Sequence, residues 1–165
     1  MDFAEREYHC PKENQIYPSI PVSGAGSCLF QSFTYFLFNK DISYDLAQNL
    51  RMECCYYIIN NSQIFLSFID SLSVEDYVNN LRNPRTSGDH IEIFCISNLY
   101  RINVWIYERN VNNRSLIKIR SKITSPLARN CDVPVKLLFF EDALHYEPLI
   151  PREYYRRIFG SCKSR

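Results

Sequence analysis

Two short segments near opposite ends of the chain carry residues that could do chemistry together. In the first, Cys28 follows the turn Gly24-Ala25-Gly26-Ser27 and opens an apolar run. The unpaired amides and the dipole at a helix start favour a thiolate, which is the nucleophilic form of cysteine. The same amides could stabilise an oxyanion when the sulfur attacks a carbonyl. Cys28 is therefore a candidate nucleophile, although a buried cysteine with only a packing role fits the local pattern equally well.

The second segment is His145-Tyr146-Glu147, which lies in a stretch with the pattern of a strand. Side chains two residues apart in a strand share a face. Glu147 can then accept a hydrogen bond from one ring nitrogen of His145, which leaves the other nitrogen to act as a base. Together with Cys28, this pair indicates a cysteine protease. His9 and His90 are interpreted as incidental, although His90 could cap a helix.

The elements that must position these segments change character once along the chain. Residues 1–27 contain three prolines and no helical period, so we expect an extended segment there. Apolar residues then recur at helical spacing, which predicts helices over about 28–39, 44–60, 64–69, 74–81 and 90–100. Alternation and apolar runs predict strands over 102–107, 115–120, 135–140 and 143–149, with 135–140 in the centre of the sheet. The prolines and lack of period in 121–134 predict a loop that faces a substrate or partner. Helices followed by strands indicate one domain, 1–165, of the α+β class.

Composition excludes several functional classes. The chain has 165 residues and a formal net charge of +1, which gives no electrostatic case for nucleic acid or an acidic membrane as main partner. The basic tail 151–165 is interpreted as a solvated end, and no apolar stretch approaches the length of a membrane span. Seven cysteines, an odd number, occur without a Cys-x-x-Cys pair or a secretory leader. We therefore expect free thiols in a reducing compartment and no metal site.

Three blocks of sequence resemble the ovarian-tumour (OTU) cysteine proteases. The segment 25–32, Ala-Gly-Ser-Cys-Leu-Phe-Gln-Ser, is similar to the nucleophile motif Asp-Gly-Asn-Cys-Leu-Phe-Arg-Ala of that family. The segment 88–107 resembles its Gly-x-x-Glu-Leu helix and following strand, and 144–149 resembles its terminal His-Tyr block. The blocks occur in the family's order and cover about residues 20–150. The resemblance implies a papain-like OTU fold, with helices packed on a small, mostly antiparallel sheet.

The resemblance also implies an activity and roles for residues. It implies a deubiquitinase that hydrolyses isopeptide bonds of ubiquitin without a metal or cofactor. By position, Cys28 is the nucleophile, His145 the general base and Glu147 the third member, while the backbone of Ala25, Gly26 and Ser27 forms the oxyanion loop. The chain departs from the family in two places, because Ala25 replaces an Asp and Glu147 replaces an Asn or Asp.

The expected partners are ubiquitin, polyubiquitin chains and ubiquitinated proteins, bound by a monomer without nucleic acid or membrane. Two alternatives stay open at this point. One is a weak or inactive module that binds ubiquitin or another partner, a possibility that Ala25 supports; the other is a polyprotein-processing protease. The expected location is the cytoplasm or nucleus, or the cytoplasm of a host cell if the protein is a viral or bacterial effector.

Overall fold

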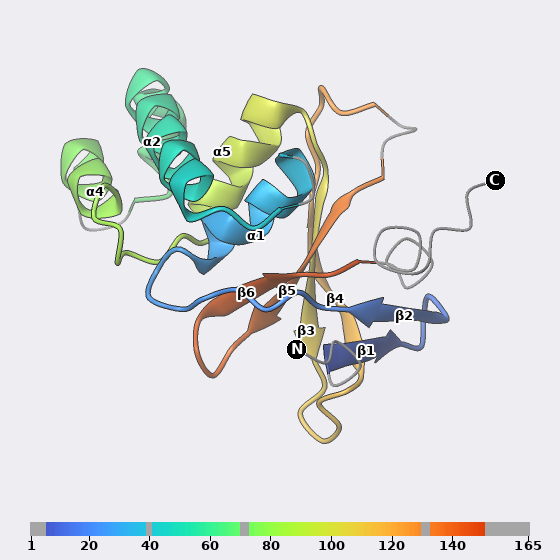
Figure 1. Ribbon diagram of the computed structural model, residues 1–165. Coiled ribbons are helices and arrows are strands. Elements are labelled where there is room, and N and C mark those ends of the chain that lie inside the picture. Colours follow the sequence, from blue (N-terminus) through green and yellow to red (C-terminus); the bar gives the residue numbers. More distant parts are fainter. Residues whose placement is uncertain (1–5, 39–40, 70–72, 130–132, 151–165) are drawn as a thin grey trace.

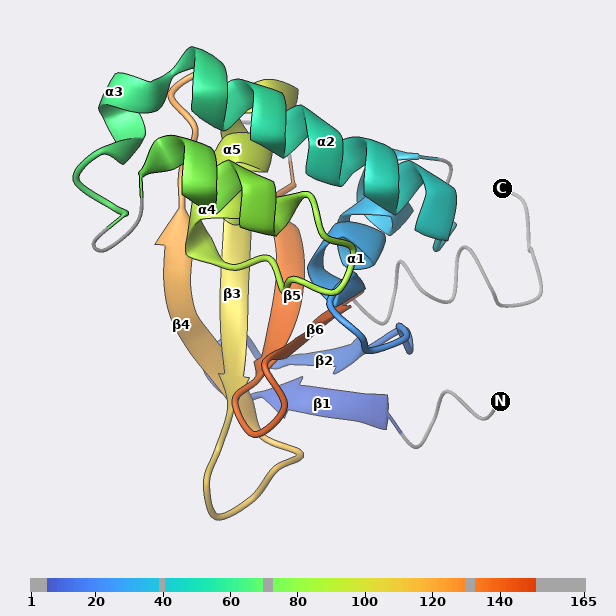
Figure 2. The ribbon, with the colours of Figure 1, turned by 90° about the vertical axis from the view of Figure 1, so that its left-hand side faces the viewer.

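The computed structural model of this chain describes residues 6–38, 41–69, 73–129 and 133–150. Figures 1 and 2 show helices gathered on one face of a sheet and a separate hairpin on the other. The helices are α1 (Cys28–Leu37), α2 (Tyr44–Asn60), α3 (Ser62–Phe65), α4 (Val74–Leu81) and α5 (His90–Tyr100). The strands are β1 (Glu7–Cys10), β2 (Gln15–Pro18), β3 (Val104–Arg109), β4 (Ile117–Ile123), β5 (Val135–Phe140) and β6 (His145–Pro148).

The main sheet has the strand order β4-β3-β5-β6. Strand β3 pairs antiparallel with β4 and parallel with β5, and β5 pairs antiparallel with β6. In β5, Leu137 and Phe139 face the helical core, whereas Leu138 faces the core under the hairpin. Because both faces of this strand are covered, its sequence is an almost continuous apolar run. The prediction of an α+β fold with a small, mostly antiparallel sheet and a central 135–140 strand is confirmed.

Two layers of helices cover one face of the sheet. Helices α1 and α5 lie next to the strands, and α2 and α4 lie outside them (Figure 2). The expected starts of the outer helices are confirmed by their caps. The Ser43 hydroxyl accepts from the Leu46 amide, and the Ser73 hydroxyl accepts from the Asp76 amide, each at 3.1 Å. Such caps satisfy amides that the first turn of a helix leaves unpaired.

The N-terminal hairpin brings the start of the chain to β6. Strands β1 and β2 pair antiparallel, and the hairpin packs on the sheet face opposite the helices. The Ile20 amide donates to the Pro148 carbonyl at 3.1 Å, and the Ser19 amide donates to the Arg6 carbonyl at 2.9 Å. Residues 6 and 19 are therefore held beside the last strand, although they lie far from it in the sequence.

Three predicted elements need correction. The described part of the 1–27 segment contains extended strands, as expected, and their pairing as the β1–β2 hairpin leaves no local signal in the sequence. The predicted helix over 64–69 is the short α3, and the strand over 102–107 is shifted to Val104–Arg109. Strand β4 continues to Ile123, so treating 121–123 as loop was wrong. The reason is that β4 is an edge strand with one exposed face, and its polar residues hide the pattern of a strand.

Candidate active site

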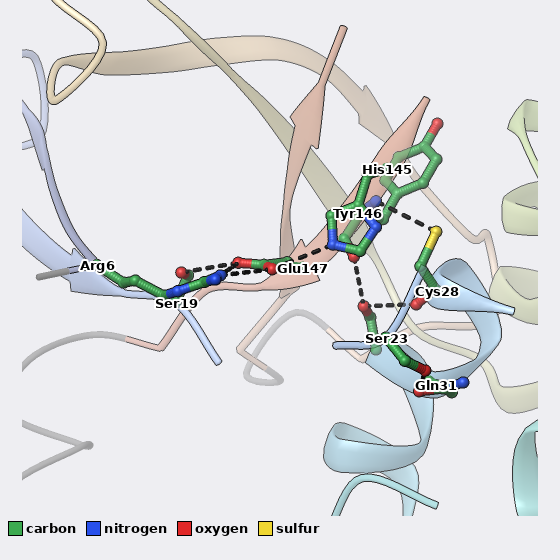
Figure 3. Close-up of polar contacts among 9 residues, drawn as sticks. Arg6, Ser19, Ser23, Cys28, Gln31, His145, Tyr146 and Glu147 are labelled. Atoms are coloured by element: carbon green, nitrogen blue, oxygen red, sulfur yellow. Dashed lines mark hydrogen bonds and ion pairs between the residues drawn. The ribbon is translucent and has the colours of Figure 1, made fainter. Parts of the chain in front are cut away.

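Cys28 is the first residue of α1, as predicted, and the first turn of this helix is fastened to β6. The Tyr146 amide donates to Cys28 Sγ at 3.4 Å (Figure 3). The Ser32 hydroxyl lies one turn along the helix, 2.7 Å from the Cys28 carbonyl and 3.2 Å from the Tyr146 carbonyl. These contacts fix the sulfur relative to the strand that carries His145. Since Cys28 begins the helix, its amide has no partner within the helix.

His145 lies between Cys28 and Glu147. Its Nε2 is 3.1 Å from Glu147 Oε2, which leaves Nδ1 as the ring nitrogen available to the thiol. The ring of Phe140 lies against the imidazole, with 5.5 Å between ring centroids. Burial alone would lower the pKa of His145. The hydrogen bond with Cys28, which has the largest effect, and the one with Glu147 outweigh burial and raise this pKa to about 9. The structure therefore favours the imidazolium form at neutral pH.

Glu147 is almost fully buried and accepts hydrogen bonds from three side chains. Its Oε1 accepts from the Ser19 hydroxyl at 3.0 Å, and Arg6 Nη1 lies 2.8 Å from Oε1 and 2.7 Å from Oε2. Burial by itself would raise the pKa of this carboxyl, but the hydrogen bonds from His145, Arg6 and Ser19 bring it below its usual value. Glu147 is thus an ionised acceptor, and the expectation that it shares a strand face with His145 is confirmed by their contact.

The turn before Cys28 has an unusual backbone. Ala25 and Gly26 have φ angles of 66° and 97°, in the left-handed region that favours glycine. A Cβ on Gly26 would clash with the Arg85 carbonyl oxygen, so this position requires glycine both for its backbone angle and for lack of space. Ser27 fixes the end of the turn, because its hydroxyl donates to the Pro84 carbonyl at 3.2 Å. A cleft of about 440 Å³ lies over Cys28 and His145, between residues 24–26, 85–87 and 143–144.

Comparison with known proteins identifies the family. The model of the OTU-like cysteine proteases matches residues 23–146, which include Cys28 and His145 and end one residue before Glu147. The chain belongs to that family. OTU domain-containing protein 4 of Homo sapiens is 29% identical over 144 residues, which are 87% of this chain and 12% of the relative. The putative ubiquitin thioesterase L96 of Tipula iridescent virus is 24% identical over 162 residues, which are 90% of this chain and 18% of the relative. The chain thus spans less than a fifth of the length of either relative.

Solved structures agree with the predicted OTU fold. The OTU domain of OTUD1 superposes with a TM-score of 0.69 at 12% identity, covering 81% of this chain and 85% of that one. An OTU domain solved in complex with ubiquitin gives a TM-score of 0.68 at 23% identity, covering 90% and 78%. The predicted papain-like OTU architecture is confirmed by this agreement.

A buried arginine that sequence reasoning missed holds the turn of this OTU domain in place. Arg51 of α2 is fully buried. Its Nη2 donates to the carbonyls of Gly26 and Pro84, each at 3.0 Å, and its Nη1 donates to those of Leu81 and Thr86, each at 2.8 Å. One side chain therefore ties the 24–27 turn to the end of α4 and to the segment that lines the cleft. A sequence signal did exist, since Arg51 falls on the apolar stripe of α2.

The remaining expectations for the site concern metals and free thiols. Among the described residues, no group of three or more His, Cys, Asp or Glu side chains could hold a metal ion. Free thiols are found at Cys10, Cys28, Cys54, Cys55 and Cys95.

Of the other two histidines, His9 lies exposed in β1, and His90 is the first residue of α5, after the capping residue Asp89. No helix within the described ranges is long and apolar enough to cross a membrane.

The raised pKa of His145 predicts a specific pH dependence. A His pKa raised from 6.5 to about 9 gives stability that is complete below pH 6.5 and is lost as the pH rises through about 9. NMR titration of the His145 ring should therefore give a midpoint near pH 9, and the melting temperature should fall as the pH passes from 6.5 to 9. In Glu147→Gln the midpoint should move to lower pH, because a negative charge is lost. A wild-type midpoint near 6.5 would contradict this prediction.

Proposed function

We propose that this protein is a cysteine-type deubiquitinase that hydrolyses the isopeptide bond between a ubiquitin C-terminus and a lysine. The observation that carries the proposal is the sequence of contacts from Cys28 through His145 to Glu147 beneath an open cleft. Relatives named as ubiquitin thioesterases and an OTU domain solved with ubiquitin support the substrate class.

The geometry suggests a role for each residue in the proposed reaction. The Cys28 thiolate attacks the carbonyl carbon of the isopeptide bond, and the charge that develops on the oxygen faces the amides of the 25–28 backbone. The His145 imidazolium gives its proton to the leaving lysine amine, and a thioester to Cys28 remains. His145, now neutral, then takes a proton from water, which attacks the thioester and releases the ubiquitin carboxylate. Glu147 holds the ring of His145 throughout.

The finer parts of the proposal concern partners and location. We include polyubiquitin chains and ubiquitinated proteins as substrates, a monomer as the acting form, and no role for nucleic acid. The near-neutral charge of the chain supports the last of these. A cytoplasmic or nuclear location is proposed as well, and the free thiols of the five cysteines that the structure describes support it.

A ubiquitin probe with a C-terminal electrophile tests both the nucleophile and the substrate class. Incubation should give a covalent adduct that is heavier than the free protein by the mass of the probe. Hydrolysis of a ubiquitin C-terminal amide substrate measures turnover in parallel. If the folded wild type reacts with none of the ubiquitin probes and substrates, the binding module is favoured over the enzyme.

The strained alanine of the turn predicts a gain of function. Aspartate tolerates left-handed backbone better than alanine does, so Ala25→Asp should relieve strain at φ 66°. We expect a higher melting temperature and a higher kcat/KM, with a gain below the about 100-fold that a missing oxyanion donor costs. Ala143→Asp places the same charge in the same cleft, at a residue without positive φ, and should give neither gain. Lower activity in Ala25→Asp would show that the loop of this chain is adapted to alanine.

Glu147 should act by accepting a hydrogen bond more than by its charge. In Glu147→Gln, the amide oxygen can take the place of Oε2, which faces both His145 and Arg6. The amide nitrogen then takes the place of Oε1 and can donate to the Ser19 hydroxyl once Arg6 Nη1 has moved away from it, so much of kcat/KM should remain. In Glu147→Ala the acceptor is lost, and kcat should fall roughly 100-fold while KM changes little. Glu108→Gln is the matched control, because Glu108 is a surface carboxylate paired with Lys118. Wild-type activity in Glu147→Ala would mean that another group holds His145.

A further inference from the structure

The carboxylate of Glu147 is held mainly from outside its own strand. Three of its four hydrogen bonds come from residues 6 and 19, which flank the N-terminal hairpin, and the fourth comes from His145 (Figure 3). The relevant oxygen is shared, because Oε2 faces both Arg6 Nη1 at 2.7 Å and His145 Nε2 at 3.1 Å. The contact to His145 is thus made by an oxygen that Arg6 holds.

We propose that Arg6, together with Ser19, positions the Glu147 carboxylate toward His145. The contacts of the site then run from Arg6 through Glu147 and His145 to Cys28. This inference deepens the proposed function and rests on it, because it assigns a positioning residue to the same reaction. Arg6 touches neither the sulfur nor the cleft, and it acts through Glu147 alone.

The need for a positioning residue follows from the length of the glutamate. Glu147 has one more rotatable bond than the Asn or Asp that the family usually has at this place. A longer side chain loses more conformational entropy when it is fixed, and without partners it would sample several rotamers. Two oxygens held by Arg6, and one of them also by Ser19, leave the carboxylate a single orientation.

The charge of Arg6 is needed for a second reason. The side chain of Glu147 is only 4% exposed, and a buried carboxylate without a cation is costly. The Arg6 side chain is 40% exposed, so its guanidinium can neutralise the carboxylate while the side chain keeps contact with water. Tyr8 also lies near the carboxylate, but burial and the charge of Glu147 raise its pKa, so it stays neutral.

The backbone keeps both donors in register with β6. The Ser19 amide donates to the Arg6 carbonyl at 2.9 Å, and Ser19 forms a bridge with Leu149, two residues beyond Glu147. This bond does not depend on either side chain. A substitution at Arg6 therefore removes the guanidinium and leaves the path of the chain in place.

Arg6→Gln and Arg6→Lys test the proposal on the full chain. We expect Arg6→Gln to lower kcat roughly tenfold and to leave KM for a ubiquitin substrate unchanged. The loss should be smaller than the cost of misplacing a catalytic group itself, which is about 100-fold. Arg6→Lys keeps the cation and should restore most of kcat. Lys118→Gln removes a surface cation whose partner Glu108 is 3.8 Å away, and it should behave as wild type. A kcat for Arg6→Gln equal to that of wild type would overturn the proposal.

Two further measurements separate positioning from a general loss of structure. In the Glu147→Ala background, Arg6→Gln should have no additional effect on kcat, because the group it positions is gone. An undiminished effect in that background would overturn the inference.

The NMR signal of the His145 Nε2 proton gives a readout that needs no substrate. It should be visible in the wild type and Arg6→Lys, and broadened by exchange with water in Arg6→Gln. An unchanged signal in Arg6→Gln would overturn the inference even if the enzyme is active. If the signal is lost in Arg6→Gln but the wild type reacts with no ubiquitin probe, the proposed function is refuted, whereas the positioning of Glu147 by Arg6 is supported.

Discussion

Cys28→Ala is expected to eliminate covalent capture by the ubiquitin probe and to lower kcat on the order of 10⁶-fold, the scale seen when a protease loses its nucleophile. The physical reason is that no other group in the cleft can form the thioester. The fold should survive, because the sulfur has only weak structural contacts, with the Tyr146 amide at 3.4 Å and with the ring of His145. We expect a free energy of unfolding lower by about 1–3 kcal/mol, the cost of one unpaired buried donor. Intact mass spectrometry measures probe capture, hydrolysis of a ubiquitin substrate measures kcat, and denaturation followed by circular dichroism measures the free energy of unfolding.

The selectivity of the probe among cysteines sharpens this prediction. Burial raises the pKa of the Cys10, Cys54 and Cys55 thiols, which keeps them protonated and poorly nucleophilic. Cys10→Ala is the matched control and should react at the wild-type rate. Peptide mapping should place the adduct on Cys28 and must include Cys131 and Cys162, which lie outside the described residues. An adduct on Cys28→Ala would refute the assignment of the nucleophile.

The parts of the site that the sequence predicted are those whose geometry is local. A cysteine after a glycine turn, with an apolar helix behind it, places its amide at a helix start whatever the rest of the fold does. The spacing of His145 and Glu147 puts two side chains on one face of a strand, and their 3.1 Å contact agrees with that rule. These rules need only the period of each element.

The partners of the groups that hold the site could not be found in this way. Arg6 lies 141 residues from Glu147 in the sequence, and nothing in the polar start of the chain indicates their pairing. Arg51 binds backbone carbonyls, and any residue type supplies a carbonyl, so its partners leave no trace in the sequence. The edge strand β4 was shortened in the prediction for a related reason, since strand pairing is decided by a distant partner.

Among the residues outside the reacting groups, Arg51 is therefore the one whose substitution should lower the free energy of unfolding most. Replacing it with methionine would remove a donor from four buried or partly buried carbonyls, and those of Gly26, Leu81 and Thr86 would be left unpaired at about 1–3 kcal/mol each, while that of Pro84 keeps the Ser27 hydroxyl. Since a domain has only about 5–15 kcal/mol of stability, we expect that variant not to fold. Arg51→Lys is the informative change, because an ammonium keeps the charge but lacks the planar fork that reaches all four carbonyls.

For Arg51→Lys we expect a free energy of unfolding lower by about 2–4 kcal/mol, the loss of one or two buried hydrogen bonds. Arg82→Lys is the control, because Arg82 makes only an exposed bond of 3.3 Å to Asn79, and a change within about 0.5 kcal/mol is expected there. Under conditions where Arg51→Lys is folded, kcat should still fall about tenfold or more, because the Gly26 carbonyl is no longer held and the oxyanion amides lose their fixed direction. Loss of stability with an unchanged kcat would mean that Arg51 stabilises the fold without orienting the turn. A drop in kcat that exceeds the unfolded fraction would establish that the buried guanidinium acts on the reaction through the backbone of residues 24–27.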